Sequence, residues 1–228
     1  MTDQSDDTST GHPRRWLILG ILNLSLVLIV AGVSSLNLSL PSIQRALGAT
    51  GVQLVWINAA YALVFAALLL PAGALGDRFG RRGALQTGLT IFIAGAVLAT
   101  QSGSAEQIIL WRSVMGIGAA LTMPATLSIL TAVFPPEERS RAIAIWAGFA
   151  GAGGAIGLLS AGLLLEYFWW GSVFLVNIPI AALALILVTL LVPTSRDTQR
   201  PPLDPAGGLL TAGGLTGLVY GLIQGPEF

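Results

Sequence analysis

The stretch WLILGILNLSLVLIVAGVSSLNLSL, Trp16 to Leu40, contains no charged side chain. At a rise of 1.5 Å per residue, about 20 apolar residues cross the roughly 30 Å hydrocarbon core of a bilayer as an α-helix. The run is too long for a strand of a membrane barrel, and too long for the apolar part of a cleaved signal peptide. Because lipid offers no hydrogen-bond partners to an exposed backbone, the stretch predicts a membrane-spanning helix.

Similar apolar runs recur along the rest of the chain. Six segments are long enough to span a bilayer, and a seventh is nearly long enough. The expected spans cover residues 16–40, 54–74, 84–101, 107–132, 142–165 and 173–192, and the seventh covers residues 206–224. A polar tail, 1–15, precedes them, and a short linker, 193–205, separates the sixth span from the seventh. We expect an all-α fold, a polytopic bundle of transmembrane helices.

The composition agrees with a membrane protein and excludes several classes of function. Charged residues make up 10% of the chain, whereas soluble domains carry roughly 25%. The formal net charge is zero, so no basic surface for nucleic acid is expected. There is no cysteine and His12 is the single histidine, so we expect neither a disulfide nor a metal site. No catalytic constellation and no phosphate-binding GxxxxGK[ST] occurs, so we expect neither an enzyme nor a cofactor.

The arginines outside the expected spans gather on one side of the predicted bundle. They precede the first span or lie in every second connection after it: Arg14, Arg15, Arg78, Arg81, Arg82, Arg139, Arg141, Arg196 and Arg200. The opposite side carries Arg45 together with the acids Glu106 and Glu166. Because arginine-rich loops stay in the cytoplasm, we expect a multi-pass protein of the inner or plasma membrane with a cytoplasmic N-terminus.

The connection between the second and third expected spans reads GALGDRFGRRGAL, Gly73 to Leu85. Its glycines permit close approach of backbones or a positive φ, and an aspartate stands among three arginines. Arginines of a short loop could serve orientation alone, and the aspartate could be a helix cap. The spacing nevertheless resembles the signature loop of the major facilitator superfamily, from which only Gly76, in place of alanine, departs. The resemblance implies a conformational gate formed by Gly73, Asp77, Arg78, Gly80, Arg81 and Arg82.

A second pattern, IILWRSVMGIGAA, lies in the fourth expected span, from Ile108 to Ala120. It contains Arg112, and a charge inside a span is costly enough to suggest a function. Arg112 lies about five residues from the outer end of the span, so its side chain could also snorkel to the headgroups. The pattern is similar to one of the same superfamily, with Met115 at a polar position. The resemblance implies that Arg112 and Gly116 face the substrate or coupling cavity.

Small residues recur at every fourth position of the fifth expected span, at Gly153, Gly157 and Ala161. Such a ladder lets a neighbouring helix come close, which predicts helix packing. It is also similar to the antiporter signature of the superfamily, although Leu158 stands where a proline is typical and Ala161 replaces a glycine. Helix packing and an antiporter-specific role therefore both remain open.

Two further resemblances point to the fourteen-span drug:proton antiporters of this superfamily. The segment SSLNLSLPSIQRALG, Ser34 to Gly48, has Asn37 and Pro41 in matching places, which implies a cavity role for Asn37. Gly32 stands where that branch has an aspartate. The segment LDPAGGLLTAGGLTGLVYGLIQGPE, Leu203 to Glu227, resembles the first of the two additional helices of the branch.

Transporters of this superfamily consist, as the resemblance implies, of two six-helix halves with the substrate between them. We therefore expect the N-terminal part of a proton-driven exporter of drugs or other small molecules. The implied partners are a small-molecule substrate, such as a hydrophobic drug-like compound, membrane lipid, and a complementary C-terminal half. The alternative is a truncated, non-transporting membrane protein or a helix-association module. No acid or histidine lies inside an expected span, so the coupling carboxylate is expected in the C-terminal half or at Glu106 and Glu166.

Overall fold

The computed structural model describes residues 11–195 and 205–224, and all regular structure within these ranges is helical. The helices are α1 (Arg15–Leu47), α2 (Gly51–Phe79), α3 (Arg81–Thr100), α4 (Ala105–Val133), α5 (Pro136–Tyr167), α6 (Ser172–Leu175), α7 (Asn177–Leu191) and α8 (Pro205–Gln224). Six segments of the described chain are long and apolar enough to cross a membrane, namely α1 to α5 and the segment Ser172–Leu191. The first ten residues of the polar tail, and the linker residues Arg196 and Arg200, lie outside the described residues.

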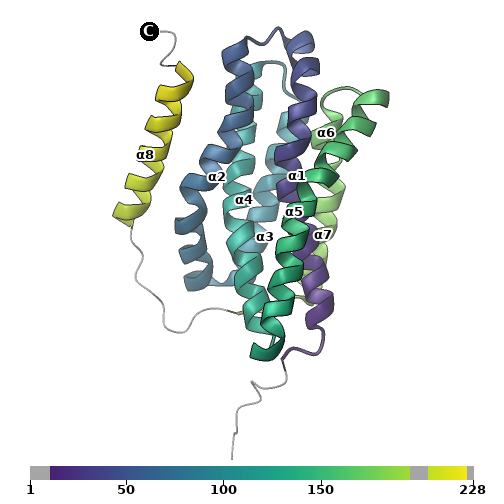
Figure 1. The fold of residues 1–228 in the computed structure, drawn as a ribbon, viewed down its shortest axis with the longest axis vertical. Helices are drawn as coiled ribbons and strands as arrows, with labels where there is room; N and C mark the ends of the chain where they lie inside the picture. The colour runs from purple at the N-terminus through teal and green to yellow at the C-terminus, as the bar shows by residue number, and fades with distance from the viewer. Residues whose placement is uncertain (1–10, 196–204, 225–228) are drawn as a thin grey trace, which may run out of the picture.

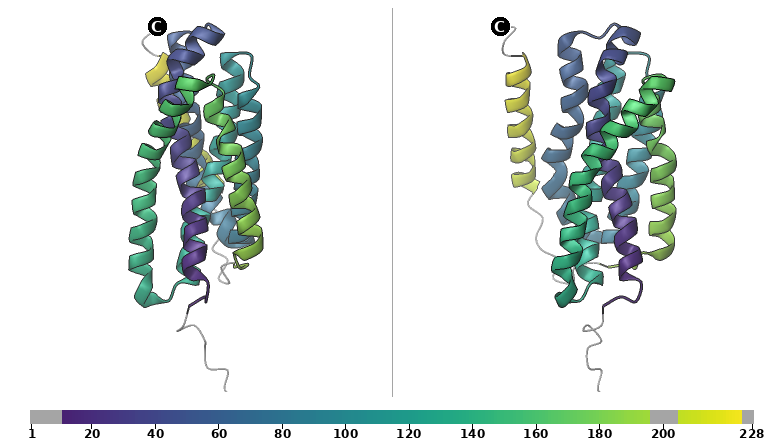
Figure 2. Two further views of the ribbon diagram at one scale, coloured as in Figure 1. Left: turned by 90° about the vertical axis from the view of Figure 1, so that its right-hand side faces the viewer. Right: turned by 45° about the vertical axis from the view of Figure 1, so that its right-hand side comes forward.

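The long helices run side by side in alternating directions (Figures 1 and 2). The start of α1, the α2–α3 and α4–α5 connections and the end of α7 therefore lie at one end of the bundle. This arginine end carries Arg15, Arg78, Arg81, Arg82 and Arg139. The far end carries Arg45, Glu106 and Glu166. Helix α8 lies against α2, apart from the other helices (Figure 1).

Helix α1 is the most buried span and packs chiefly on α5, α4 and α7. It continues past the expected end of the first span to Leu47, with Pro41 inside the helix. Proline has no backbone N–H, so Pro41 removes one hydrogen bond near the end of the helix, and the turns after it remain helical. The helix ends at Gly48, whose φ of 65° lies in the left-handed region and whose N–H donates to the carbonyl of Gln44.

The sixth expected span, residues 173–192, is interrupted in the structure. The short helix α6 ends at Leu175, and α7 begins at Asn177. Pro179 explains the break, because proline has no N–H to offer the carbonyl four residues earlier, which belongs to Leu175, and its ring crowds that group. The Asn177 side chain donates to the carbonyl of Val173 at 2.6 Å, which adds a hydrogen bond across the interruption.

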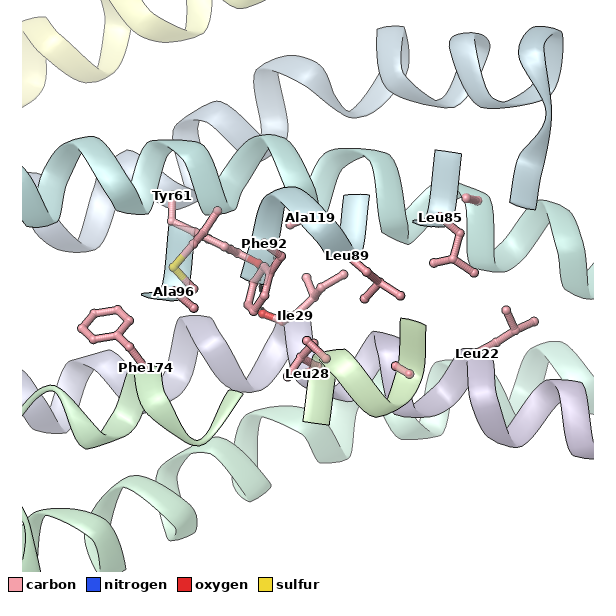
Figure 3. Packing of buried hydrophobic residues seen from close by; sticks show 14 of the residues in the cluster. Leu22, Leu28, Ile29, Tyr61, Leu85, Leu89, Phe92, Ala96, Ala119 and Phe174 are labelled. Atoms are coloured by element: carbon pink, nitrogen blue, oxygen red, sulfur yellow. Dashed lines mark hydrogen bonds between the residues drawn. The ribbon is translucent and has the colours of Figure 1, made fainter. Parts of the chain in front are cut away.

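The core of the bundle lies where α3 and α4 meet α1. Figure 3 shows Phe92 and Leu89 of α3 pointing toward Ile29 of α1. Glycine brings the backbones of α3 and α4 into direct contact, since a Cβ on Gly118 would lie 2.6 Å from the carbonyl oxygen of Gly88. Contacts this close leave no room for any side chain, so these two helices are held together at backbone distance.

This contact predicts opposite effects for two alanine substitutions. Alanine normally stabilises a helix relative to glycine, by up to about 1 kcal/mol. Gly118→Ala should instead lower the melting temperature of the purified chain in detergent, by about 5 °C, because the added methyl group forces α3 and α4 apart. Gly83→Ala in α3 is the matched control, because its Cβ meets nothing within 4 Å. Equal melting temperatures of the two variants would contradict the proposed packing.

Candidate functional site

Arg112 lies between α1, α2 and α4, seven residues after the start of α4 at Ala105. Its side chain is 0% exposed, so it does not snorkel to the headgroups. The Nη1 group donates to the carbonyl of Gly32 at 2.9 Å, and Nε donates to the carbonyl of Ile57 at 3.3 Å. The guanidinium carbon lies 4.5 Å from the centre of the Tyr61 ring. One side chain of α4 thus binds the backbones of both α1 and α2.

The charge of Arg112 has no carboxylate partner in the described part of the chain. The ion pairs found there join Arg15 to Glu138 and Arg81 to Asp77. Carbonyl dipoles and the face of an aromatic ring are what compensate the buried guanidinium. Its Nη2 group has no hydrogen-bond partner among the described residues. Such a group retains the capacity to bind a further acceptor.

Tyr61 of α2 and Gly116 of α4 hold α2 against this site. The Tyr61 hydroxyl donates to the carbonyl of Ile29 at 3.1 Å, which adds a second bond between α2 and α1. A Cβ on Gly116 would lie 2.7 Å from the carbonyl oxygen of Tyr61. The structure therefore places Gly116 in a close contact between α4 and α2. Sequence reasoning did not select Tyr61 as a site residue, although a tyrosine inside an apolar run is a visible signal.

Asn37 lies on a groove between α1 and α2 in the half of the bundle nearer the far end. Its Oδ1 accepts a hydrogen bond of 3.0 Å from Nδ2 of Asn58. The groove has a volume of about 410 Å³, and the other lining residues are Val33, Leu40, Leu54, Val55, Ala59 and Ala62. The two carbonyl acceptors of Arg112, Gly32 and Ile57, are the residues that immediately precede the lining residues Val33 and Asn58 in the chain. Asn58 was not predicted, although it is a polar residue inside an expected span.

The signature loop is organised around two arginines. Arg81 Nε donates to Oδ1 of Asp77 at 2.7 Å, one helical turn earlier in the chain. Gly80 joins α2 to α3 with a φ of 129°, a backbone conformation that residues other than glycine rarely adopt. Arg82 donates to the carbonyls of Val192 at 3.0 Å and Thr189 at 2.5 Å. Arg82 thus binds the last carbonyls of α7, where a cation is also favoured by the helix dipole.

The remaining residues of the loop have different surroundings. The backbone N–H of Arg81 donates to the carbonyl of Ser195 at 3.0 Å, so the loop also touches the segment after α7. The Arg78 guanidinium lies 5.6 Å from the centre of the neighbouring Phe79 ring. A Cβ on Gly73 would lie 3.3 Å from Cβ of Pro124, so Gly73 is where α2 approaches α4. The loop therefore links α2, α3, α4 and α7.

The small-residue ladder of α5 packs against α1. A Cβ on Gly157 would lie 2.6 Å from the carbonyl oxygen of Ala31, and one on Gly153 would lie 3.0 Å from Cβ of Val30. Ala161 is 0% exposed. Close packing of α5 on α1 thus accounts for Gly153 and Gly157.

An ion pair that sequence reasoning missed joins α1 to α5 at the arginine end. Arg15 donates through Nε and Nη2 to the two carboxylate oxygens of Glu138, at 2.7 and 2.9 Å. The ring of Trp16 packs edge-on against Phe134, with 5.1 Å between the ring centres. The sequence indicated only the orienting role of Arg15, because the partner lies more than a hundred residues away.

The geometry of Arg112 predicts a graded series of variants. Arg112→Met should remove both carbonyl bonds and lower the stability of the purified chain strongly. Arg112→Lys should recover little, because one ammonium group cannot bind both carbonyls and lie over the Tyr61 ring. Tyr61→Phe should cost about 1 kcal/mol, the usual contribution of one hydrogen bond. Thermal unfolding in detergent measures the series, and a lysine variant as stable as the parent chain would contradict this geometry.

Comparison with known proteins agrees with this architecture. Residues 22–223 match the Major Facilitator Superfamily. The chain is 40% identical over 205 residues to the multidrug efflux pump LfrA of Mycolicibacterium smegmatis, covering 90% of this chain and 41% of LfrA. It is 38% identical over 208 residues to the methyl viologen resistance protein SmvA of Salmonella typhimurium, covering 91% of this chain and 42% of SmvA. The chain thus spans about two fifths of the length of these relatives.

Solved structures show the same fold at low sequence identity. The peptide transporter POT in complex with sulfate matches with a TM-score of 0.71 and 18% identity, over 95% of this chain and 47% of POT. An inward-facing bacterial homologue of the human lysosomal transporter Spinster matches with a TM-score of 0.63 and 23% identity, over 85% of this chain and 45% of that protein. With its six candidate spans, this chain is a multi-pass membrane protein and belongs to the Major Facilitator Superfamily.

Proposed function

We propose that the chain forms the N-terminal half of a proton-driven exporter of small molecules in the cell membrane. The observation that carries the proposal is the similarity, over nine tenths of the chain, to relatives named for multidrug efflux and methyl viologen resistance. The chain covers about two fifths of these relatives, so a complementary half would supply the remaining walls of the transport path. Transport, and not catalysis, is the activity of this superfamily.

The signature loop has the connections that a conformational gate requires. It holds the start of α3 to the end of α7 through Arg82, and it closes on itself through the pair of Asp77 and Arg81. A change in this network would alter how α2, α3 and α7 are held at the arginine end. We therefore assign the gate to these contacts and the substrate to the far half of the bundle, where the groove lies.

Proton coupling needs a group that gains and loses a proton along the transport path. The acids of the described chain lie at helix ends, and Glu106 and Glu166 are those at the far end. Glu106 lies in the first turn of α4 and accepts a 2.5 Å hydrogen bond from Nε2 of Gln53 of α2. We assign the coupling carboxylate to one of these two residues or to the complementary half.

The orientation of the chain gives a direct labelling prediction, because the native sequence has no cysteine. Gln101 lies exposed at the far end, and Glu137 lies exposed at the arginine end. A membrane-impermeant maleimide should label the Gln101→Cys variant in intact cells. It should label the Glu137→Cys variant only after lysis, because arginine-rich connections stay inside. The reverse pattern would overturn the cytoplasmic assignment of the N-terminus.

Export itself is tested by supplying the missing half. Cells that express the chain together with the C-terminal portion of SmvA should accumulate several-fold less ethidium than cells that express either part alone. A protonophore should abolish the difference. Asp77→Asn is the matched inactive variant, because it removes the negative charge that pairs with Arg81 and leaves the groove unchanged. If the two parts co-purify as a folded complex and ethidium still accumulates as in the single-part cells, the exporter proposal is wrong.

A further inference from the structure

The single histidine of the chain, His12, lies in a turn that leads into α1. The backbone N–H of Arg15 donates to the carbonyl of His12 at 3.0 Å, which closes a four-residue turn with Pro13 at its second position, where proline is favoured. The backbone N–H of Arg14 donates to Nδ1 of His12 at 3.1 Å. A side chain that accepts from the backbone two residues later is typical of Asn and Asp. His12 therefore takes the place of an amide or a carboxylate in this turn.

The hydrogen bond to Arg14 requires a neutral imidazole. A backbone N–H can only donate, so the Nδ1 atom that faces it must offer a lone pair. Only the neutral imidazole does so, with its proton on Nε2. Protonation would place an N–H at Nδ1, opposite the N–H of Arg14, and the turn would lose its side-chain bond. Histidine is the residue type whose charge changes between about pH 5 and pH 8 in ordinary surroundings. Acidification therefore opposes this turn.

The turn also contacts the connection between α4 and α5. The backbone N–H of His12 donates to the carbonyl of Val133, the last residue of α4, at 2.9 Å. Gly11 has a φ of 65° and lies so close to Pro135 that a Cβ on it would be 2.5 Å from Cδ of the proline. Pro135 immediately precedes α5. The turn thus ties the start of α1 to the place where α4 passes into α5.

The charged groups around the docked turn do not favour a second positive charge there. The last turn of α4 carries none, so the charged residues are those of the segment itself and of the first turns of α5: Arg14, Arg15, Glu137, Glu138, Arg139 and Arg141. Arginines outnumber glutamates, and Glu138 already pairs with Arg15. An imidazolium would add to this excess. The undocked turn therefore binds more protons than the docked one, so docking weakens as the pH falls and strengthens as it rises.

We propose that the turn of residues 12–15 is a pH-sensitive contact, docked on the α4–α5 connection at neutral pH and released under acidic conditions. His12 is the group that titrates. The bond of Arg15 to Glu138 and the packing of Trp16 on Phe134 hold the first turn of α1 in place, so the release is confined to the turn before it. That the contact responds to the pH of the cytoplasm rests on the orientation in the proposed function. The contact itself does not, and it is measured without transport.

The mobility of a spin label at position 14 measures the release. Arg14→Cys keeps the backbone N–H that the turn uses, the Arg14 side chain is exposed, and the native chain has no cysteine. In the purified, labelled chain, the ratio of mobile to immobile label should rise about tenfold when the pH is lowered across the range in which histidine titrates, from about 7.5 to about 5.5, the effect of losing about one hydrogen bond. A label on Gln101→Cys, at the far end, should show no change.

Two substitutions of His12 separate its titration from other effects of pH. In the Arg14→Cys background, His12→Asn keeps an acceptor for the N–H of residue 14 and does not titrate, so the label should stay immobile at both pH values. His12→Ala removes the acceptor, so the label should be mobile at both. A folded protein is verified for each variant by its elution as a single species in detergent.

Three results would each overturn the proposal. The first is a label mobility that does not change with pH while His12 is present. The second is an equal change in the His12→Asn variant, which would assign the titration to another group, and the third is an immobile label in the His12→Ala variant. Mobility as expected, combined with failure of the two-part chain to export ethidium, would support the pH-sensitive contact and refute only the exporter.

Discussion

The arrangement of the bundle depends on one buried guanidinium. Arg112 has carbonyl oxygens of α1 and α2 as its hydrogen-bond partners, at 2.9 and 3.3 Å, and no carboxylate of the described chain compensates its charge. A charge in this position is tolerable only while both backbones stay within hydrogen-bond distance. Close contacts make this possible, because Gly116 lets α4 touch the backbone of α2 at Tyr61, and Tyr61 in turn bonds to α1.

The two ends of the bundle differ in how they are held. At the arginine end, Arg15 joins α1 to α5 through Glu138, and Arg82 joins α3 to α7. In the other half of the bundle, the amide pair of Asn37 and Asn58 joins α1 to α2, and Gln53 of α2 donates to Glu106 of α4.

The sequence was sufficient to predict the parts of the fold that depend on local composition. The run from Trp16 to Leu40 predicted a helix, and the structure has one. The break before Asn177 was missed, because the apolar pattern continues through it and only the position of Pro179 indicates it. The loop motif identified the superfamily, which the comparison confirms.

The partners of the site residues could not be predicted in the same way. Arg112 was selected as a charge inside a span that faces a cavity, but its acceptors are backbone carbonyls, which every residue has and which no sequence pattern marks. The same holds for Arg82 and the end of α7. Glu138 was overlooked because its pairing with Arg15 depends on the packing of two distant helices.

Hydrogen exchange of the backbone measures the central constraint most directly. In the Arg112→Met variant, amides of α1 around residues 29–36 and of α2 around residues 57–61 should exchange at least about tenfold faster than in the parent chain, because these segments lose their shared partner. Amides of α3 and α4 at the contact of Gly88 with Gly118 should keep their protection. Unchanged exchange in α1 and α2, or an equal increase along all helices, would contradict the view that Arg112 holds these helices in place.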